Sequence, residues 1–196
     1  TRAKAMQSVV ARLLAEHDNL GGLVRLLDRQ PALMADPDAP NIGLLVDALF
    51  YLTRFPDVTH HALEDRIGER LRRKGALEAT VAAELGAQHA ALARQGHDLL
   101  RDLESAARGE TMSRELLQAN IRLYAERLRH NMAVEELTLL PAARHRLDEA
   151  DWQAIADDFA RGPAGQGVGV RGIELLRHGL SDPLFGTPAE ARFAQL

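Results

Sequence analysis

The 196-residue chain contains no cysteine. Disulfide bonds and thiolate metal ligands are therefore excluded, and any bound metal must be held by nitrogen and oxygen atoms. Disulfide-free chains are typical of reducing compartments, so we expect a cytoplasmic location.

Aromatic residues and strand patterns are scarce as well. Aromatic side chains make up 4% of the residues, whereas 46% of the residues are hydrophobic, and alanine, leucine, arginine and glutamate are abundant. Runs of β-branched residues are almost absent, and no convincing alternation of apolar and polar residues is found. Because this is the composition of helical proteins, the sequence predicts an all-α fold.

Strongly basic stretches and long apolar runs are missing too. The formal net charge is -4, with both signs mixed along the chain, and the short basic run at residues 70–74 is typical of a helix C-terminus. No apolar run approaches the ~20 residues of a membrane span. We therefore expect neither nucleic acid nor a membrane as a partner.

Apolar residues recur at three- and four-residue spacing in four long segments. This pattern predicts helices over about residues 3–30, 41–74, 76–109 and 113–147. Pro31 should end the first helix, whereas Pro56 and Pro141 should kink or break the second and the fourth. Since the connections are short, we expect an antiparallel up-down four-helix bundle.

The C-terminal part of the chain has a different residue pattern. A shorter fifth helix is expected from Asp148 to about Ala160, followed by a glycine-rich stretch and a weak helix near residues 173–178. We therefore divide the chain into a bundle with its fifth helix, residues 1–161, and an irregular tail packed on the bundle, residues 162–196.

Each of the four long helices places an imidazole on or near its apolar stripe, and two of the helices add a carboxylate nearby. A buried carboxylate is costly unless it is paired or binds a metal. Histidines and carboxylates that project into a bundle core are the ligands of di-iron and di-manganese sites. The side chains concerned are His17, His60 or His61, His89 and His130, with Glu64 and Glu135.

On the second helix, two alternative pairs of a histidine and an acidic residue could bind one metal ion. His60 and Glu64 are four residues apart, as are His61 and Asp65, and either pair stacks on one helix face. We prefer the first register, which makes His61 a neighbour of the ligands, and the second register stays open.

Several of these residues, in this order, resemble the hemerythrin-like, or HHE cation-binding, domain. The matching features are His17, His60-x-x-x-Glu64, His89 and the segment from Tyr124 to Pro141. Residues 147–152 and the tail at 182–186 are also similar to sequences of the family. The resemblance thus extends over most of the chain.

The resemblance implies a non-haem di-iron centre with a carboxylate and an oxo or hydroxo bridge. Carried over, the metal ligands would be His17 and His60 as terminal ligands, Glu64 as a bridge, His89, and His130 with Glu135. Zinc would suit the same donors as a substitute. The small ligand implied is dioxygen, nitric oxide or peroxide.

Two positions depart from the family pattern. Bacterial family members with a similar sequence pattern usually carry a histidine four residues before the last bridging acid. This chain has Asn131 at that position. Either His130 takes that role, or Asn131 fills the position as a weak oxygen donor or a non-ligand. On the third helix, oxygen carriers have a second histidine where this chain has Ala93, which implies a more open site. Tyr124, His61 and Asn131 are candidates for contact with the ligands rather than the metal.

Three functions follow, of which we prefer the first and keep the other two as alternatives. The first is a di-iron protein that senses or handles dioxygen, nitric oxide, iron or redox state. The second is a di-iron enzyme acting on peroxide or ferrous iron. The third is a metal-free interaction or regulatory module whose site has decayed at Asn131. A homodimer stays open as an assembly state.

Overall fold

The structure is a computed structural model that describes residues 4–35 and 42–161. Within these ranges every regular element is a helix, which confirms the all-α prediction. The tail, including the helix expected near residues 173–178, lies outside the described residues. Two of the elements are π-helical turns, labelled η. The elements are α1 (Lys4–Asp28), α2 (Gln30–Leu33), α3 (Ile42–Phe55), η1 (Pro56–His60), α4 (His61–Arg73), α5 (Ala79–Ala107), α6 (Arg114–Val134), η2 (Glu135–Leu139), α7 (Leu140–Arg146) and α8 (Glu149–Arg161).

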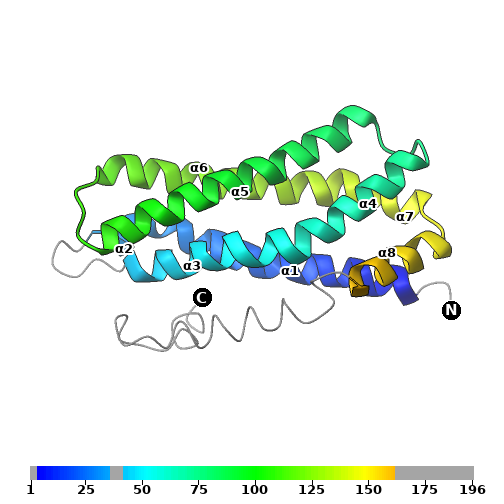
Figure 1. The fold of residues 1–196 in the computed structure, drawn as a ribbon, viewed down its shortest axis with the longest axis horizontal. Helices are drawn as coiled ribbons and strands as arrows, with labels where there is room; N and C mark the ends of the chain where they lie inside the picture. The colour runs from blue at the N-terminus through cyan, green and yellow to red at the C-terminus, as the bar shows by residue number, and fades with distance from the viewer. Residues whose placement is uncertain (1–3, 36–41, 162–196) are drawn as a thin grey trace.

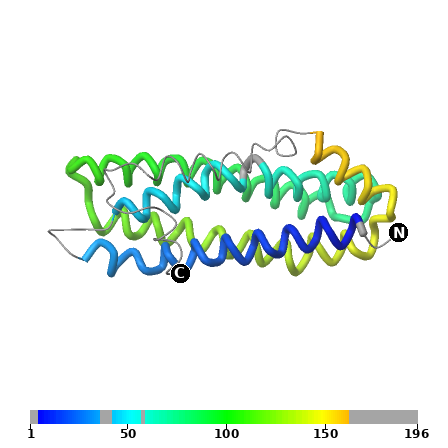
Figure 2. Tube along the Cα trace, turned by 90° about the horizontal axis from the view of Figure 1, so that it is seen from below, coloured from blue at the N-terminus to red at the C-terminus, as the bar shows by residue number. Residues whose placement is uncertain are grey.

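The long helices lie side by side and surround a common interior. The chain reverses direction between α1 and α3, between α4 and α5, and between α5 and α6 (Figure 1). Helix α1 contacts α3 and α6, and α5 contacts the same two helices. Helix α8, in the place of the expected fifth helix, packs against α1 and α4 near the N-terminal end of the molecule (Figure 2).

The prolines neither end nor kink the helices in the way that the sequence predicts. The first helix ends at Asp28, and Pro31 lies in the first turn of α2, where its missing N–H costs nothing. Pro56 starts the π turn η1, in which the N–H of His61 donates to the carbonyl of Pro56, five residues back. The helix therefore widens at Pro56 and continues.

A second π turn lies in the last long helical segment. In η2 the N–H of Leu140 donates to the carbonyl of Glu135, and Pro141 follows in the first turn of α7. The irregularity thus precedes Pro141 rather than following it. Single π turns inside α-helices occur frequently at functional sites.

Left-handed glycines and a serine set the ends of the long helices. Gly75 follows α4 with φ +62°, and Gly109 follows α5 with φ +79°, a conformation that side chains disfavour. Ser113 caps α6 by accepting a hydrogen bond from the N–H of Leu116 at 3.2 Å. The third helix begins at Ala79, three residues later than the apolar pattern indicates.

The buried apolar side chains form two separate clusters along the bundle. One contains Leu20, Leu49, Leu92 and Leu128, and the other contains Leu13, Leu63, Leu85 and Leu139. Along every long helix the chain passes from one cluster to the other through a short polar stretch. The two cores are therefore separated by a layer of polar residues inside the bundle.

Within the described ranges, no helix combines the length and the apolar character needed to cross a membrane.

Two glycines of α5 allow a matched test of the close packing in the first core. A Cβ at Gly96 would lie 2.7 Å from Cγ2 of Thr53 and 3.1 Å from Cε2 of Tyr124, whereas a Cβ at Gly86 would meet no atom within 4 Å. We expect Gly96→Ala to lower the free energy of unfolding by about 1–3 kcal/mol through overpacking. Gly86→Ala should raise it by about 0.5–1 kcal/mol through helix propensity. Urea denaturation measures both, and equal effects of the two substitutions would contradict the packing.

Candidate metal centre

The polar layer between the two cores consists of histidines and glutamates from each long helical segment. His17 comes from α1, His60 from η1, His89 from α5 and Glu135 from η2, and each of these side chains is buried. Glu64, from α4, is 2% exposed, and Glu135 is fully buried. Carboxylates at this depth require positive partners, either protons on the imidazoles or metal ions.

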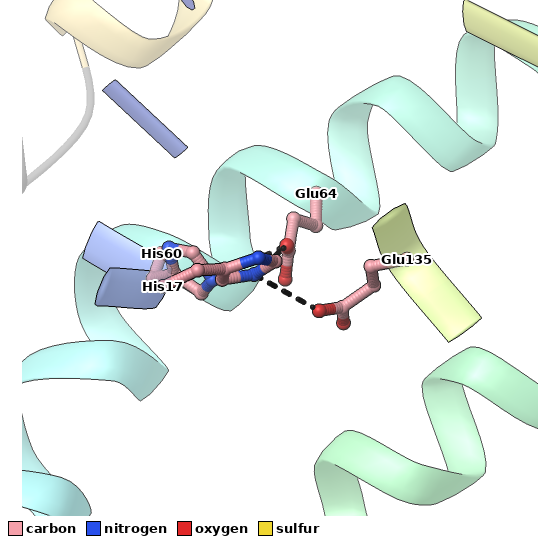
Figure 3. A group of neighbouring side chains, drawn as sticks. All are labelled: His17, His60, Glu64 and Glu135. Atoms are coloured by element: carbon pink, nitrogen blue, oxygen red, sulfur yellow. Dashed lines mark ion pairs between the residues drawn. The ribbon is translucent and has the colours of Figure 1, made fainter. Parts of the chain in front are cut away.

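One group of donor atoms contains His17, His60, Glu64 and Glu135 (Figure 3). One nitrogen or oxygen atom from each residue lies within 4.8 Å of all the others. Nε2 of His17 is 3.2 Å from Oε2 of Glu135 and 3.4 Å from Oε1 of Glu64. Nε2 of His60 is 3.2 Å from the same Glu64 oxygen. We call this group the first half-site.

A second group contains His61, Glu64 and His89, whose donor atoms also lie within 4.8 Å of one another. Nε2 of His89 is 3.6 Å from Oε2 of Glu64 and 2.9 Å from Oε1 of Glu135. The second half-site therefore uses the other oxygen of each glutamate. Glu64 and Glu135 therefore lie between two pairs of histidines.

The π turn before α4 allows two consecutive histidines to serve the two half-sites. Neighbouring residues of an α-helix point about 100° apart, so that they seldom face one interior site. A π turn places more residues in each turn and reduces this angle. His60 and His61 stand at the junction of η1 and α4, with ring centroids 5.7 Å apart. The ring of His61 stacks on that of His89 at 4.2 Å.

Three of the histidines have a second carboxylate on the ring nitrogen that faces away from the centre. In each pair Nδ1 donates a hydrogen bond to a carboxylate from another helical segment. Such outer carboxylates fix the orientation of metal-binding imidazoles and raise their basicity. The pairs are His17 with Glu136 at 2.8 Å, His60 with Glu16 at 2.8 Å and His89 with Asp65 at 3.0 Å.

The carboxylates hold the histidines as cations when no metal is bound. Burial alone lowers the pKa of His17, but its contacts with Glu135, Glu64 and Glu136 outweigh burial and raise that pKa to about 10. For His89, burial is outweighed by Asp65 and Glu135, and its pKa also rises to about 10. Burial raises the pKa of Glu64, and the histidine contacts outweigh it, holding this pKa well below its ordinary value.

The donor atoms facing the centre fit metal cations better than they fit one another. Nε2 of His17, Nε2 of His60, both oxygens of Glu64 and Oε2 of Glu135 are buried without a hydrogen-bond partner. Native structures leave few buried polar atoms unsatisfied, so a converging group of five calls for a ligand. Imidazole nitrogen and carboxylate oxygen are donors that suit iron, zinc and manganese.

The structure brings together most of the residues selected from the sequence, but not His130. His17, His60, Glu64, His89 and Glu135 converge, whereas His130 is on the exposed face of α6. The reason is angular, because five residues are about 140° around a helix, so His130 and Glu135 diverge.

Asn131 lies beside the site, whereas Tyr124 lies in the first core. Asn131 is buried, and its Nδ2 donates hydrogen bonds to Oε1 of Glu135 at 2.8 Å and to Oε1 of Gln88 at 3.2 Å. It therefore orients the shared glutamate through its amide nitrogen. Tyr124 packs in the first core beside Gly96.

The structure adds to what the sequence indicates for four residues near the site. His61 was expected next to the ligands, yet its donor atom belongs to the second half-site. Asp65 was considered only as the partner of His61, and Glu16 and Glu136 were not selected from the sequence. Each of these three carboxylates is partly exposed and is tied to the site by its histidine partner. Their only sequence signal is the adjacency of Glu16 to His17, of Asp65 to Glu64 and of Glu136 to Glu135.

The raised pKa values predict how the stability of the metal-free protein depends on pH. The folded state binds more protons than the unfolded state between the ordinary histidine pKa of 6.5 and the folded values of about 9 for His60 and about 10 for His17 and His89. The free energy of unfolding should therefore fall as the pH rises through this range, by about 1.4 kcal/mol per pH unit for each extra proton. Urea denaturation of chelator-treated protein at a series of pH values measures this. His89→Gln should flatten the slope, and stability that is constant or rising above pH 6.5 would contradict the arrangement.

Comparison with known proteins agrees with this site. A family model described as the hemerythrin HHE cation-binding domain matches residues 8–143, a range that includes every member of both half-sites. Comparison with curated proteins and with solved structures gave no match. Since the family model spans more than half of the chain, this chain belongs to the hemerythrin HHE cation-binding domain family.

Proposed function

We propose that this protein binds two non-haem iron ions inside an antiparallel four-helix bundle and uses them to bind or sense a small diatomic molecule. The observation that carries the proposal is the sharing of Glu64 and Glu135 between two histidine pairs. Two ions that share carboxylates typically lie about 3.5–4 Å apart.

The residues divide into two ligand sets with shared bridges. His17 and His60 would hold one ion, His61 and His89 would hold the other, and both glutamates would bridge. Each ion would thus receive two neutral nitrogen ligands and oxygen from two carboxylates. Such a set leaves coordination positions open for an external ligand.

The charges around the centre support a pair of multivalent cations. Besides the two glutamates that would bridge the ions, three outer carboxylates bond to the histidines. These are Glu16, Asp65 and Glu136. Five carboxylates therefore surround the proposed ions, and the Arg12 guanidinium offsets the charge of Glu16. The ions would carry four positive charges as two ferrous ions and six as two ferric ions. A charge balance close to both states favours a centre that changes oxidation state without a large electrostatic cost.

Iron bound in this site would supply a redox couple and positions at which dioxygen or nitric oxide can coordinate. The chain itself contributes the two apolar cores, which flank the centre and limit its contact with bulk water. It also contributes Asn131, whose hydrogen bond fixes the Glu135 oxygen that faces His89. The second half-site has this amide where related bacterial domains carry a histidine, so we place the position for the external ligand there.

Iron reconstitution tests the proposal directly. Metal-free protein loaded anaerobically with ferrous iron should retain about two iron ions per chain after desalting. Exposure to air should produce the near-ultraviolet absorption of a bridged ferric pair, and nitric oxide should alter the ferrous spectrum. Fewer than one retained ion per chain, or ferric absorption typical of isolated ions, would contradict the proposal.

Two histidine substitutions distinguish the observed ligand set from the one suggested by spacing. His61→Ala should reduce iron retention from about two ions to about one, because the second half-site loses a nitrogen ligand. His130→Ala serves as the matched control, since this exposed side chain lies on α6 and belongs to neither half-site. Metal analysis of both variants decides the matter. Loss of iron from His130→Ala with full retention by His61→Ala would contradict the assignment.

A further inference from the structure

A cavity of about 290 Å³ opens between α4 and α5 and reaches the second half-site. Its buried end is lined by Glu64 and His89, with side chains 1% and 9% exposed. Its outer end is lined by three charged side chains that remain in contact with solvent. These are Asp65 at 60%, Glu69 at 39% and Arg72 at 55% exposed. The cavity therefore extends from solvent to the side chains of Glu64 and His89, whereas the two Glu64 oxygens themselves are covered.

The buried end presents a carboxylate that lacks a hydrogen-bond partner. Both oxygens of Glu64 are inaccessible to solvent, and neither has a hydrogen-bond partner. An ion arriving through the cavity would meet this carboxylate and the imidazole of His89 together. A carboxylate without a hydrogen-bond partner beside an imidazole suits a cation rather than an anion.

The charges along the cavity favour the same species. Three carboxylates, Glu64, Asp65 and Glu69, line it, together with the guanidinium of Arg72 and the imidazole of His89. Because His89 is a cation in the metal-free protein, these five groups carry a net charge of minus one. Glu69 accepts hydrogen bonds of 2.8 and 2.9 Å from Arg72 and a further one of 2.8 Å from Arg73. Loss of the Glu69 charge would therefore make the mouth less attractive to cations, and loss of the Arg72 charge would make it more attractive.

The volume agrees with the size of a hydrated ion. A water molecule takes up about 30 Å³ in the liquid, so a divalent ion with six waters needs roughly 200 Å³. A dehydrated ion would need far less room than the cavity provides. Small side chains such as Ala82 form part of the wall and leave this space open.

We propose that this cavity is the entry route by which a hydrated divalent cation reaches the second half-site, with Glu69 and Asp65 as the carboxylates that it passes. The ion exchanges its waters for Glu64 and His89 at the buried end. The inference rests on the proposed metal centre and concerns how that centre is filled. It assigns Glu69 and Arg72 opposite effects on the rate of filling, without making either of them a ligand.

The rate of Co²⁺ uptake by the metal-free full chain tests the route. In stopped-flow measurements at low ionic strength, Glu69→Gln should slow uptake by about threefold, because one attractive charge is lost at the mouth. Arg72→Gln should accelerate uptake by a similar factor, and both effects should shrink as salt is added. Ala82→Leu should slow uptake without this dependence on salt, since it narrows the passage.

The control is Glu126→Gln, which removes an exposed carboxylate from α6. Glu126 pairs with Arg129 three residues later, as Glu69 pairs with Arg72, but it does not line the cavity. Its uptake rate should equal that of the unaltered chain, and Glu69→Gln should bind as much Co²⁺ at saturation as the unaltered chain. Equal rates for the Glu69, Arg72 and Glu126 variants would overturn the entry route while leaving the metal centre intact. Failure of the unaltered chain to bind Co²⁺ would overturn the centre, and the route with it.

Discussion

The structure depends on the pairing of two buried glutamates with four imidazoles in the middle of an apolar bundle. Glu64 and Glu135 have almost no contact with solvent, and both lie between the two leucine-rich cores. Ionised carboxylates at such a depth are tolerated only with positive partners, either protons on the histidines or metal cations. The bundle therefore carries a polar layer that costs stability in the absence of a cation and gains it when a cation binds.

The two π turns of the backbone position several residues of this polar layer. One ends at His60, and the other begins at Glu135, so each of them places a shared or terminal donor at its edge. The widened turn lets consecutive residues take complementary roles. His60 and His61 belong to different half-sites, while Glu135 faces the centre and Glu136 accepts the hydrogen bond from Nδ1 of His17. A regular α-helix would direct one member of each pair away from the site.

Much of the site could be predicted from the sequence because its signal is periodic. His17, Glu64 and His89 interrupt leucine stripes at helical spacing, and the structure brings them together. The choice between His60 and His61 stayed open, because a π turn leaves no mark in the sequence beyond Pro56 and a regular helix directs two neighbouring side chains to different faces. The outer carboxylates could not be found from spacing, since each of them bonds to a histidine on another helical segment. Such tertiary pairs become visible only when the helices are packed.

The central claim is that Glu64 and Glu135 are shared by two cations. The most direct measurement is a crystal structure of the iron-loaded protein with anomalous scattering recorded at the iron edge. The account predicts two anomalous peaks, one beside His17 and His60 and the other beside His61 and His89, with both glutamate carboxylates between them. A single peak, or a peak ligated by His130, would contradict it.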